Sequence, residues 1–241
     1  GMEPGEYENI ARLEAVHWWY VGMRRIAESV LRTARLPPRA QVLDAGCGTG
    51  GGLLWLAAFG RPTGIDFHPL AVQYAARESP RVARASIEAA PFPAETFDLV
   101  TSFEVLYHLG VTDDAAALRE LARVLRPGGW LLVRVPAYDW LRGAHDRQVH
   151  TRHRYGAREL KEKIAAAGLE LKRLTGVGLW LWPAAVLKRL TERADAAHSD
   201  VTLPAPFVNR ALTAILSAEA RWLRRFDLPL GLSLLALAHK P

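Results

Sequence analysis

Glycines between residues 44 and 52 have the spacing of a nucleotide-binding turn. The stretch reads DAGCGTGGG from Asp44 to Gly52, after a strand-like apolar run and before a helical pattern. Glycines let the backbone turn tightly and approach a ligand, and the following helix offers unpaired N–H groups. The cofactor stays open at this point, because Gly46, Gly48 and Gly51 also satisfy the G-x-G-x-x-G pattern of dinucleotide-binding proteins.

Two acidic residues narrow the choice of ligand. Asp66 follows at the end of the next predicted strand, where a carboxylate can accept hydrogen bonds from both ribose hydroxyls. NAD and S-adenosylmethionine both carry such a ribose, so Asp66 indicates a nucleoside without choosing between them. Asp44 would repel a pyrophosphate but attract an ammonium and a sulfonium. This carboxylate could also cap the turn, but its position favours the methyl donor.

His108 is the candidate catalytic residue, directly after the predicted strand that ends at Phe103. Its imidazole could take a proton near neutral pH. Methyl transfer from a sulfonium is an in-line displacement, so positioning in a desolvated pocket supplies much of the rate. A base is needed only for a poorly ionised hydroxyl or a protonated nitrogen. We therefore predict one of two roles for His108, a general base or a residue that orients the loop.

A polar segment after the next predicted strand is the candidate acceptor-binding loop. It carries several histidines, an aspartate, two arginines and a tyrosine: His145, Asp146, His150, Arg152, His153, Arg154 and Tyr155. Their spacing matches no strong metal-ligand motif, so no metal site is predicted. The arginines could bind an acidic group of the acceptor. The predicted substrate residues are Tyr20, His150, His153, Tyr155 and Trp180.

Aromatic residues lie close to basic residues in two segments, 17–25 and 180–189. The segment HWWYVGMRR, from His17 to Arg25, predicts a cover over the donor with Arg24 near its carboxylate, or plain packing of the tryptophans against the sheet. Near the other end, Trp180, Trp182, Lys188 and Arg189 could form an interfacial helix for a lipid-bearing substrate. A buried helix in the lid explains the same four residues and is the favoured interpretation.

Short apolar runs alternate with helical patterns over residues 39–175. This alternation predicts βαβ units and a doubly wound, mostly parallel α/β sheet of the Rossmann-like class. The predicted strands are Gln41–Ala45, Thr63–Asp66, Val82–Ala85, Asp98–Phe103, Trp130–Val135, Glu170–Leu174 and Ser233–His239. The predicted helices between them are Gly51–Phe59, Pro69–Glu78, Asp113–Leu125 and Ala157–Ala167, with Pro69 in a first turn and Asp113 as a cap.

We expect a single domain over residues 1–241. A helical N-terminal cover (1–36) ends at two prolines and precedes the cofactor-binding core (37–175). A helical insertion (176–228), with helical stretches near 183–197 and 206–226, separates the core from a last strand (229–241). This insertion would lie over one end of the sheet, where it is a candidate lid or substrate wall.

Four ordered segments resemble the class I S-adenosylmethionine-dependent methyltransferases of the small-molecule, type 11-like kind. They are Val42–Gly50, Gly64–Asp66, Ala90–Val100 and Leu121–Val135. The resemblance covers roughly residues 40–175 and rests on the order and spacing of these segments. It implies a seven-stranded sheet whose last strand runs antiparallel. It also implies that S-adenosyl-L-methionine, converted to S-adenosyl-L-homocysteine, lies across the first, second and fourth strands.

The resemblance also implies roles for individual residues. Gly46, Cys47 and Gly48 would approach the methionine part of the donor, with Phe103 and Glu104 on the same side, and Asp66 would hold the ribose. The residues implied around the adenine are Phe67, Ser86, Ile87 and Glu88. Ser86 stands where many members carry an acid, so the partner of the adenine amino group stays open among Ser86, Glu88 and a backbone carbonyl.

Composition excludes several classes of protein. The chain has 241 residues, 50% hydrophobic and 23% charged, with one cysteine and a net charge of +6. One cysteine excludes an internal disulfide framework, and the apolar runs are too short to span a bilayer, so we expect a cytoplasmic protein. The basic residues are scattered, which disfavours nucleic acid, and the same charge would suit an anionic small molecule or a membrane surface. With the resemblance, we expect a small-molecule acceptor that is acidic or linked to a lipid or sugar. The rival functions are an NAD-type oxidoreductase and a non-catalytic donor-binding protein.

Overall fold

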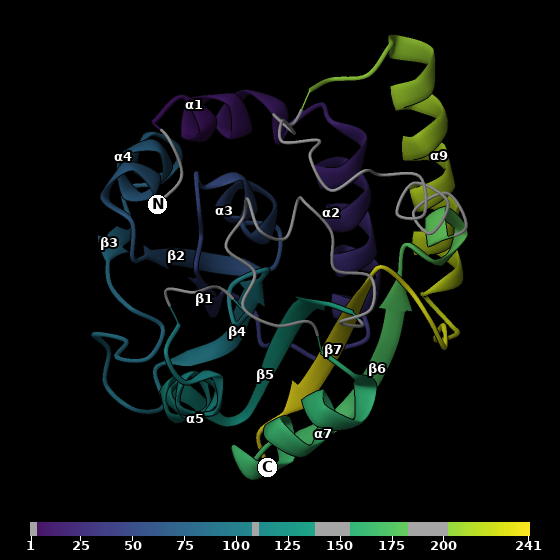
Figure 1. Cartoon of the computed structure of the whole chain (residues 1–241). Coiled ribbons are helices and arrows are strands. Elements are labelled where there is room, and N and C mark those ends of the chain that lie inside the picture. The colour runs from purple at the N-terminus through teal and green to yellow at the C-terminus, as the bar shows by residue number, and fades with distance from the viewer. Residues whose placement is uncertain (1–3, 108–110, 138–154, 183–201) are drawn as a thin grey trace.

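A seven-stranded sheet forms the centre of the chain (Figure 1). The computed structural model describes residues 4–107, 111–137, 155–182 and 202–241. The strands lie in the order β3-β2-β1-β4-β5-β7-β6, and β7 runs antiparallel to both of its neighbours while the other pairings are parallel. They are β1 (Ala40–Ala45), β2 (Gly60–Asp66), β3 (Val82–Arg84), β4 (Phe97–Phe103), β5 (Leu125–Pro136), β6 (Glu170–Val177) and β7 (Ser233–His239).

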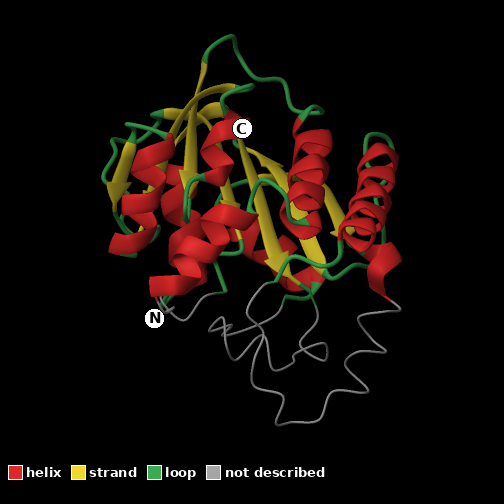
Figure 2. Cartoon of the chain, turned by 90° about the horizontal axis from the view of Figure 1, so that it is seen from above, coloured by secondary structure: helices red, strands yellow, loops and turns green. Residues whose placement is uncertain are grey.

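Helices lie on both sides of this sheet (Figure 2). They are α1 (Pro4–Leu13), α2 (Trp18–Leu31), α3 (Gly51–Leu56), α4 (Pro69–Glu78), α5 (Asp114–Val124), α7 (Ala157–Ala166), the short 3-10 helix η2 (Leu179–Leu181) and α9 (Pro206–Trp222). One core cluster joins α5 and α7 to the sheet face that carries Val100 and Leu131. A second cluster joins α2 and α9 to the opposite face, which carries Val42, Leu99 and Leu132. Alternate residues of the central strands therefore fill two separate cores.

The structure confirms the predicted Rossmann-like sheet and its antiparallel last strand. Each predicted strand forms, with β5 and β6 longer than the apolar pattern indicated. The Asp113 side chain accepts a hydrogen bond from the Ala116 N–H at 2.9 Å, which is the predicted helix cap, and Pro69 begins α4. The confirmed predictions rest on local sequence signals, namely the apolar run of a strand and the residues in the first turn of a helix.

Helix α9 lies on a face of the sheet, beside α2 (Figure 1). The buried side chains of Leu216, Ala220 and Leu223 pack into the same core as α2. This position corrects the interpretation of α9 as a lid over one end of the sheet, because the apolar side of the helix is used to cover the sheet. The other predicted stretch of the insertion, 183–197, lies outside the described residues.

Asn209 joins α9 to the junction between α1 and α2. Its side-chain oxygen accepts a hydrogen bond from the Trp18 N–H at 2.8 Å, and its amide donates to the Val16 carbonyl at 2.8 Å. We expect Asn209→Ala to lower the free energy of unfolding by about 1–2 kcal/mol, because two backbone groups lose their partner. Urea unfolding measures this loss. The exposed neighbour Arg210 is the control, and Arg210→Ala should change stability by less than about 0.5 kcal/mol; equal losses would contradict the assigned bridge.

Candidate functional site

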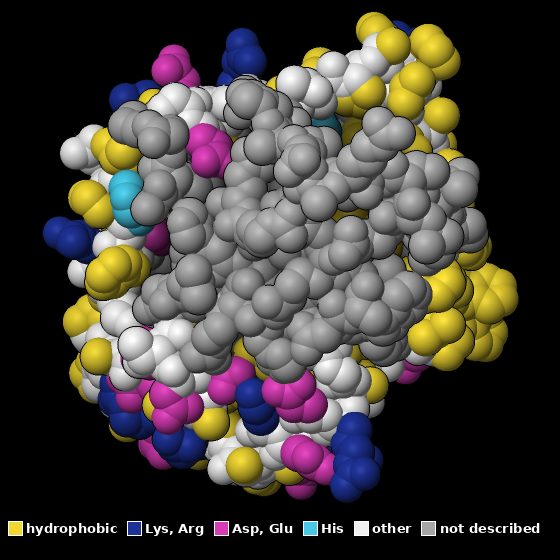
Figure 3. All heavy atoms as spheres, in the orientation of Figure 1, with side chains coloured by type: hydrophobic (Ala, Val, Ile, Leu, Met, Phe, Trp, Pro, Cys, Tyr) yellow, Lys and Arg dark blue, Asp and Glu magenta, His cyan; other side chains and the backbone are white. Residues whose placement is uncertain are grey.

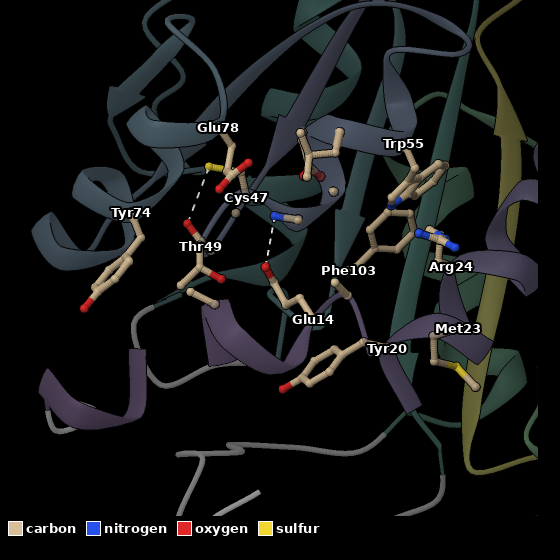
Figure 4. Close-up of a pocket in the computed structure, with 18 of the residues that line it drawn as sticks. Glu14, Tyr20, Met23, Arg24, Cys47, Thr49, Trp55, Tyr74, Glu78 and Phe103 are labelled. Atoms are coloured by element: carbon tan, nitrogen blue, oxygen red, sulfur yellow. Dashed lines mark hydrogen bonds between the residues drawn. The ribbon is translucent and has the colours of Figure 1, made fainter. Parts of the chain in front are cut away.

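A cavity of about 560 Å³ lies at the carboxyl end of β1, where the glycine-rich turn meets the N-terminal helices (Figure 4). Its walls come from α1 and α2, from the turn and α3, from α4, and from the ends of β4 and β5. Ligands of open α/β sheets bind at this edge. The predicted site residues that line the cavity are Tyr20, Arg24, Asp44, Gly46, Cys47, Gly48, Phe103 and Glu104.

Backbone hydrogen bonds hold the glycine-rich turn in place. The N–H groups of Gly46 and Cys47 both donate to the Ile65 carbonyl of β2, at 2.8 and 2.9 Å. Gly46 has φ +88°, and a Cβ there would lie 2.2 Å from Cγ2 of Val105. Glycine is therefore required at this position both by the backbone conformation and by the close approach of the loop after β4.

Asp66 stabilises the turn from the end of β2. One carboxylate oxygen accepts a hydrogen bond from the Gly48 N–H at 3.0 Å, and the other accepts from the His68 N–H at 2.9 Å. Two further acceptor positions remain on a carboxylate that already takes two hydrogen bonds. Its geometry thus links the glycine turn to β2, and its predicted contact with a ribose stays a prediction.

Asp44 is a buried carboxylate in the cavity wall. Its Oδ1 accepts a hydrogen bond from the Thr101 hydroxyl at 2.8 Å, and a Cβ on Gly52 would lie 2.5 Å from its Oδ2. The missing side chain at Gly52 therefore makes room for the carboxylate against the start of α3. Burial raises the pKa of Asp44 to about 6, because a charged group loses hydration there. A cationic ligand would restore the ionised form.

Glu14 is a second carboxylate in this wall, and the sequence interpretation missed it. The chain turns after α1 and places Glu14 over the glycine-rich turn, where Oε2 accepts a hydrogen bond from the Gly51 N–H at 3.1 Å (Figure 4). Burial raises the pKa of Glu14 to about 7. No local pattern marks this residue, because its role depends on a contact between segments 37 residues apart.

The raised pKa of Glu14 predicts a pH-dependent stability of the ligand-free protein. The folded chain holds this proton up to about pH 7, against an ordinary pKa of 4.5. The associated stability is complete below pH 4.5 and is lost as the pH rises through 7. We expect the stability of wild type relative to Glu14→Gln to fall by about 2 kcal/mol between mildly acidic and mildly alkaline pH.

Thermal and urea unfolding over this pH range measure the difference between the two proteins. Glu162→Gln is the control, because that side chain is exposed on α7 and pairs with Arg158. Its pH profile should follow that of wild type. Parallel profiles for wild type and Glu14→Gln would contradict the buried, protonated Glu14.

The far wall of the cavity carries an ion pair and aromatic side chains. Glu104, with φ +61°, accepts a hydrogen bond from Nε of Arg134 at 2.8 Å, and the Arg134 guanidinium lies over the Phe103 ring at 5.2 Å. Tyr20 lies at the mouth, and burial raises its pKa to about 12, so the phenol stays protonated. Arg24 points into the cavity (Figure 4), and its buried Nε has no hydrogen-bond partner among the described residues.

The residues predicted around the adenine lie outside this cavity, on the β2 and β3 side of the turn. Phe67 is 62% exposed, and Ile87 is buried. The Ser86 hydroxyl accepts from the Glu88 N–H at 3.1 Å. Glu88 accepts from Thr112 and from the Asp113 N–H at 2.9 Å. Partial burial tends to raise the pKa of Glu88, but these hydrogen bonds outweigh it and the pKa lies below its usual value. Glu88 thus stabilises the segment before α5, and the partner of the adenine amino group stays a prediction among Ser86, Glu88 and a backbone carbonyl.

Two predicted substrate residues lie elsewhere. Tyr155 is fully buried, and its hydroxyl hydrogen-bonds the carboxylate of Asp114, so it packs in the core between β5 and α5 and does not face the cavity. Trp180 lies beside α9, where its N–H is 3.4 Å from Glu219. Neither residue lines the cavity, and their contact with an acceptor stays a prediction. The remaining candidates lie outside the described residues: His108, His145, Asp146, His150, Arg152, His153, Arg154, Lys188 and Arg189.

The sequence comparisons identify the family. A family model described as a methyltransferase domain matches residues 43–133, the segment that carries the turn and β4. A probable S-adenosylmethionine-dependent methyltransferase from Mycolicibacterium smegmatis is 33% identical over 70% of this chain and 65% of its own length. The chain belongs to the class I S-adenosylmethionine-dependent methyltransferases. Their methyl donor is S-adenosylmethionine.

Other similar proteins agree with this assignment. The 2-methyl-6-phytyl-1,4-hydroquinone methyltransferase of Synechocystis is 40% identical over 47% of this chain and 36% of its own. A putative methyltransferase solved in complex with the Haloferax volcanii Trm112 activator has a TM-score of 0.63 at 20% identity, covering 98% of this chain and 97% of its own. The chain thus spans about one third to two thirds of the length of these curated relatives. The structural similarity to the Haloferax complex covers 98% of this chain.

Two further observations concern ligands and membranes. Within the described residues of this chain, no group of three or more histidines, cysteines and carboxylates is placed to bind a metal ion. Among the helices that the structure describes, none is both long and apolar enough to span a bilayer.

Proposed function

We propose that this chain transfers a methyl group from S-adenosylmethionine to a small-molecule acceptor. The observation that carries the proposal is the charge of the cavity wall. Asp44 and Glu14 are carboxylates withdrawn from solvent that have no ion-pair partner in the described part of the chain. Buried charges need a partner, and the donor carries two positive charges, an ammonium and a sulfonium. The positive charges of the donor therefore complement the two carboxylates of the cavity wall.

The residues around the two carboxylates fit the rest of the donor. Gly46 and Gly48 expose backbone next to Asp44 with no Cβ in the way. Arg24 also lines this cavity; its Nε lies 3.7 Å from Glu28 Oε1 without a hydrogen bond, so the guanidinium could still bind a carboxylate of the donor. Asp66, behind the turn, is the residue proposed to hold the ribose. The sulfonium of the donor supplies an electrophilic methyl group: the acceptor forms a bond to this carbon as the S–CH3 bond breaks, and S-adenosylhomocysteine leaves as a neutral thioether.

The protein's part in this chemistry is positioning and the exclusion of water. Trp55 and Phe103 lie 6.0 Å apart between ring centroids and close the apolar side of the cavity, next to Met23. An in-line displacement with dispersed charge gains most from such a dry, ordered pocket. We propose His108 as the general base or orienting residue, on its position five residues after the end of β4.

Of the two rival functions, only the NAD-type oxidoreductase fits the cavity wall less well. A dinucleotide would bring its pyrophosphate against Asp44, so an NAD-type oxidoreductase is disfavoured. A non-catalytic donor-binding protein would use the same cavity, so only a turnover experiment separates it from a methyltransferase. We further propose that the protein is cytoplasmic, on the ground of its single, buried cysteine. We also propose that the acceptor has an apolar part, on the ground of the apolar side chains in the cavity wall and the phytyl hydroquinone named for the Synechocystis relative.

The test combines binding with turnover. Isothermal titration should show binding of S-adenosylhomocysteine and no binding of NAD; the reverse result would exclude the methyltransferase. Donor labelled in its methyl group is then incubated with the chain and a cell extract, which is separated into organic and aqueous phases. Label should enter the organic phase. Label that remains entirely in unreacted donor, in a protein that binds the donor, would favour a non-catalytic protein.

A further inference from the structure

The outward face of α9 exposes large apolar side chains. Phe207 is 75% exposed, Ile215 36% and Trp222 49%, and Phe226, just beyond the helix, is 55% exposed. The inward face is fully used, with Leu216 and Leu223 buried against α2 and the sheet. Figure 3 shows hydrophobic side chains along the edge of the molecule where α9 lies.

These residues form a continuous stripe. They recur at helical spacing, with Ala211 and Ala218 between them, so they lie on one side of α9. The Trp222 and Phe226 rings are 5.1 Å apart between centroids. Trp180 is 47% exposed and adjoins α9 through its contact with Glu219, so it extends the apolar surface. Exposed apolar surface of this kind marks an interaction site.

Basic residues accompany the stripe, and the exposed acid that follows it, Asp227, is ion-paired with Arg173. Arg210, Arg221, Arg224 and Arg225 are exposed, and none forms an ion pair with any described residue. Glu219 is the only acid in α9, and it is buried, accepting hydrogen bonds from the Gly178 and Trp180 N–H groups. The exposed face of α9 is thus apolar and positively charged.

We propose that α9 docks the protein on an anionic lipid surface, with Trp222 and Phe226 in the headgroup layer and the arginines against lipid phosphates. Tryptophan and arginine both favour this boundary, since it accommodates an apolar ring and a cationic group together. A nucleic acid would pair with the arginines but leave the apolar stripe in water. A neutral partner would leave the arginines unpaired.

This surface is separate from the donor cavity, because none of its residues lines that cavity. The proposal therefore stands or falls independently of methyl transfer. It assigns a use to the aromatic residues at and before α9, and it brings the protein to the place where an apolar acceptor would be found.

Flotation with vesicles tests the proposal. Vesicles of phosphatidylcholine mixed with phosphatidylglycerol should carry the protein upward, and vesicles of phosphatidylcholine alone should not. Arg221→Glu/Arg225→Glu should lower partitioning by about 25-fold or more, since each arginine near an anionic surface raises affinity about fivefold. Trp222→Ser/Phe226→Ser should lower it by about tenfold.

The matched control is Arg158→Glu/Lys161→Glu, which makes the same charge change on exposed positions of α7, on the other face of the sheet. It should float like wild type, and all variants should keep the wild-type circular dichroism spectrum and donor affinity. Wild type that remains with the aqueous fraction would overturn the proposal, as would α9 variants that float unchanged. A dimer abolished by Trp222→Ser/Phe226→Ser, without vesicle binding, would assign the stripe to self-association instead.

Discussion

Replacing Asp44 with Asn is expected to weaken the binding of S-adenosylmethionine by about 100-fold. Asn has the same shape and can still accept the Thr101 hydrogen bond, so the change removes mainly the charge. A buried, charge-assisted interaction contributes about 1.5–3 kcal/mol, which corresponds to this loss. Isothermal titration measures the effect. The control ligand is 5′-methylthioadenosine, which lacks the ammonium and the sulfonium, and its affinity should change by less than about threefold.

The pH dependence of binding adds a second readout. Burial raises the pKa of Asp44 to about 6 and that of Glu14 to about 7 in the ligand-free cavity. A cationic donor binds the ionised carboxylates. At a pH below these pKa values, each carboxyl group must first lose its proton, so the donor affinity should rise from pH 5 to 8. Asp44→Asn should remove the part of this rise near pH 6, and Glu14→Gln the part near 7. Equal losses for donor and control ligand would show that Asp44 acts through the structure of the turn.

Local sequence signals predicted the arrangement of the glycine-rich turn and Asp66. Asp44, the glycines and Asp66 lie within 23 residues and are joined by one βαβ unit, so their order in the chain determines their arrangement. Strand ends, glycine spacing and the Asp113 cap all depend on neighbouring residues. Short-range physics was sufficient there, which is why the fold and the glycine-rich part of the site were predictable.

The residues that the sequence interpretation missed or misplaced depend on tertiary contacts. Glu14 reaches the cavity only because α1 folds back over the turn. Tyr155 has a polar neighbourhood in the sequence, yet its ring fills the core and its hydroxyl finds Asp114 from another element. The apolar pattern of α9 predicts a buried helix but not which neighbour covers it. Such pairings have no period or spacing by which they could be recognised.

Gly46→Ala is expected to lower the free energy of unfolding by about 3 kcal/mol and to weaken donor binding more than about 100-fold. The backbone at Gly46 has φ +88°, which costs any other residue about 1–2 kcal/mol. The new Cβ would also lie 2.2 Å from Cγ2 of Val105, so either the turn or the loop after β4 must move. Urea unfolding and titration with S-adenosylhomocysteine measure the two losses.

Two further variants separate the conformational cost from the steric one. Gly128 has φ +82°, and no atom lies within 4 Å of the position that a Cβ would take there. Gly128→Ala should therefore cost only the conformational part, about 1–2 kcal/mol, and leave donor affinity unchanged. Gly46→Ala/Val105→Ala removes the clash but not the strain, and it should recover part of the lost affinity. If Gly46→Ala binds the donor like wild type, the glycine-rich turn does not hold the methionine part of the donor.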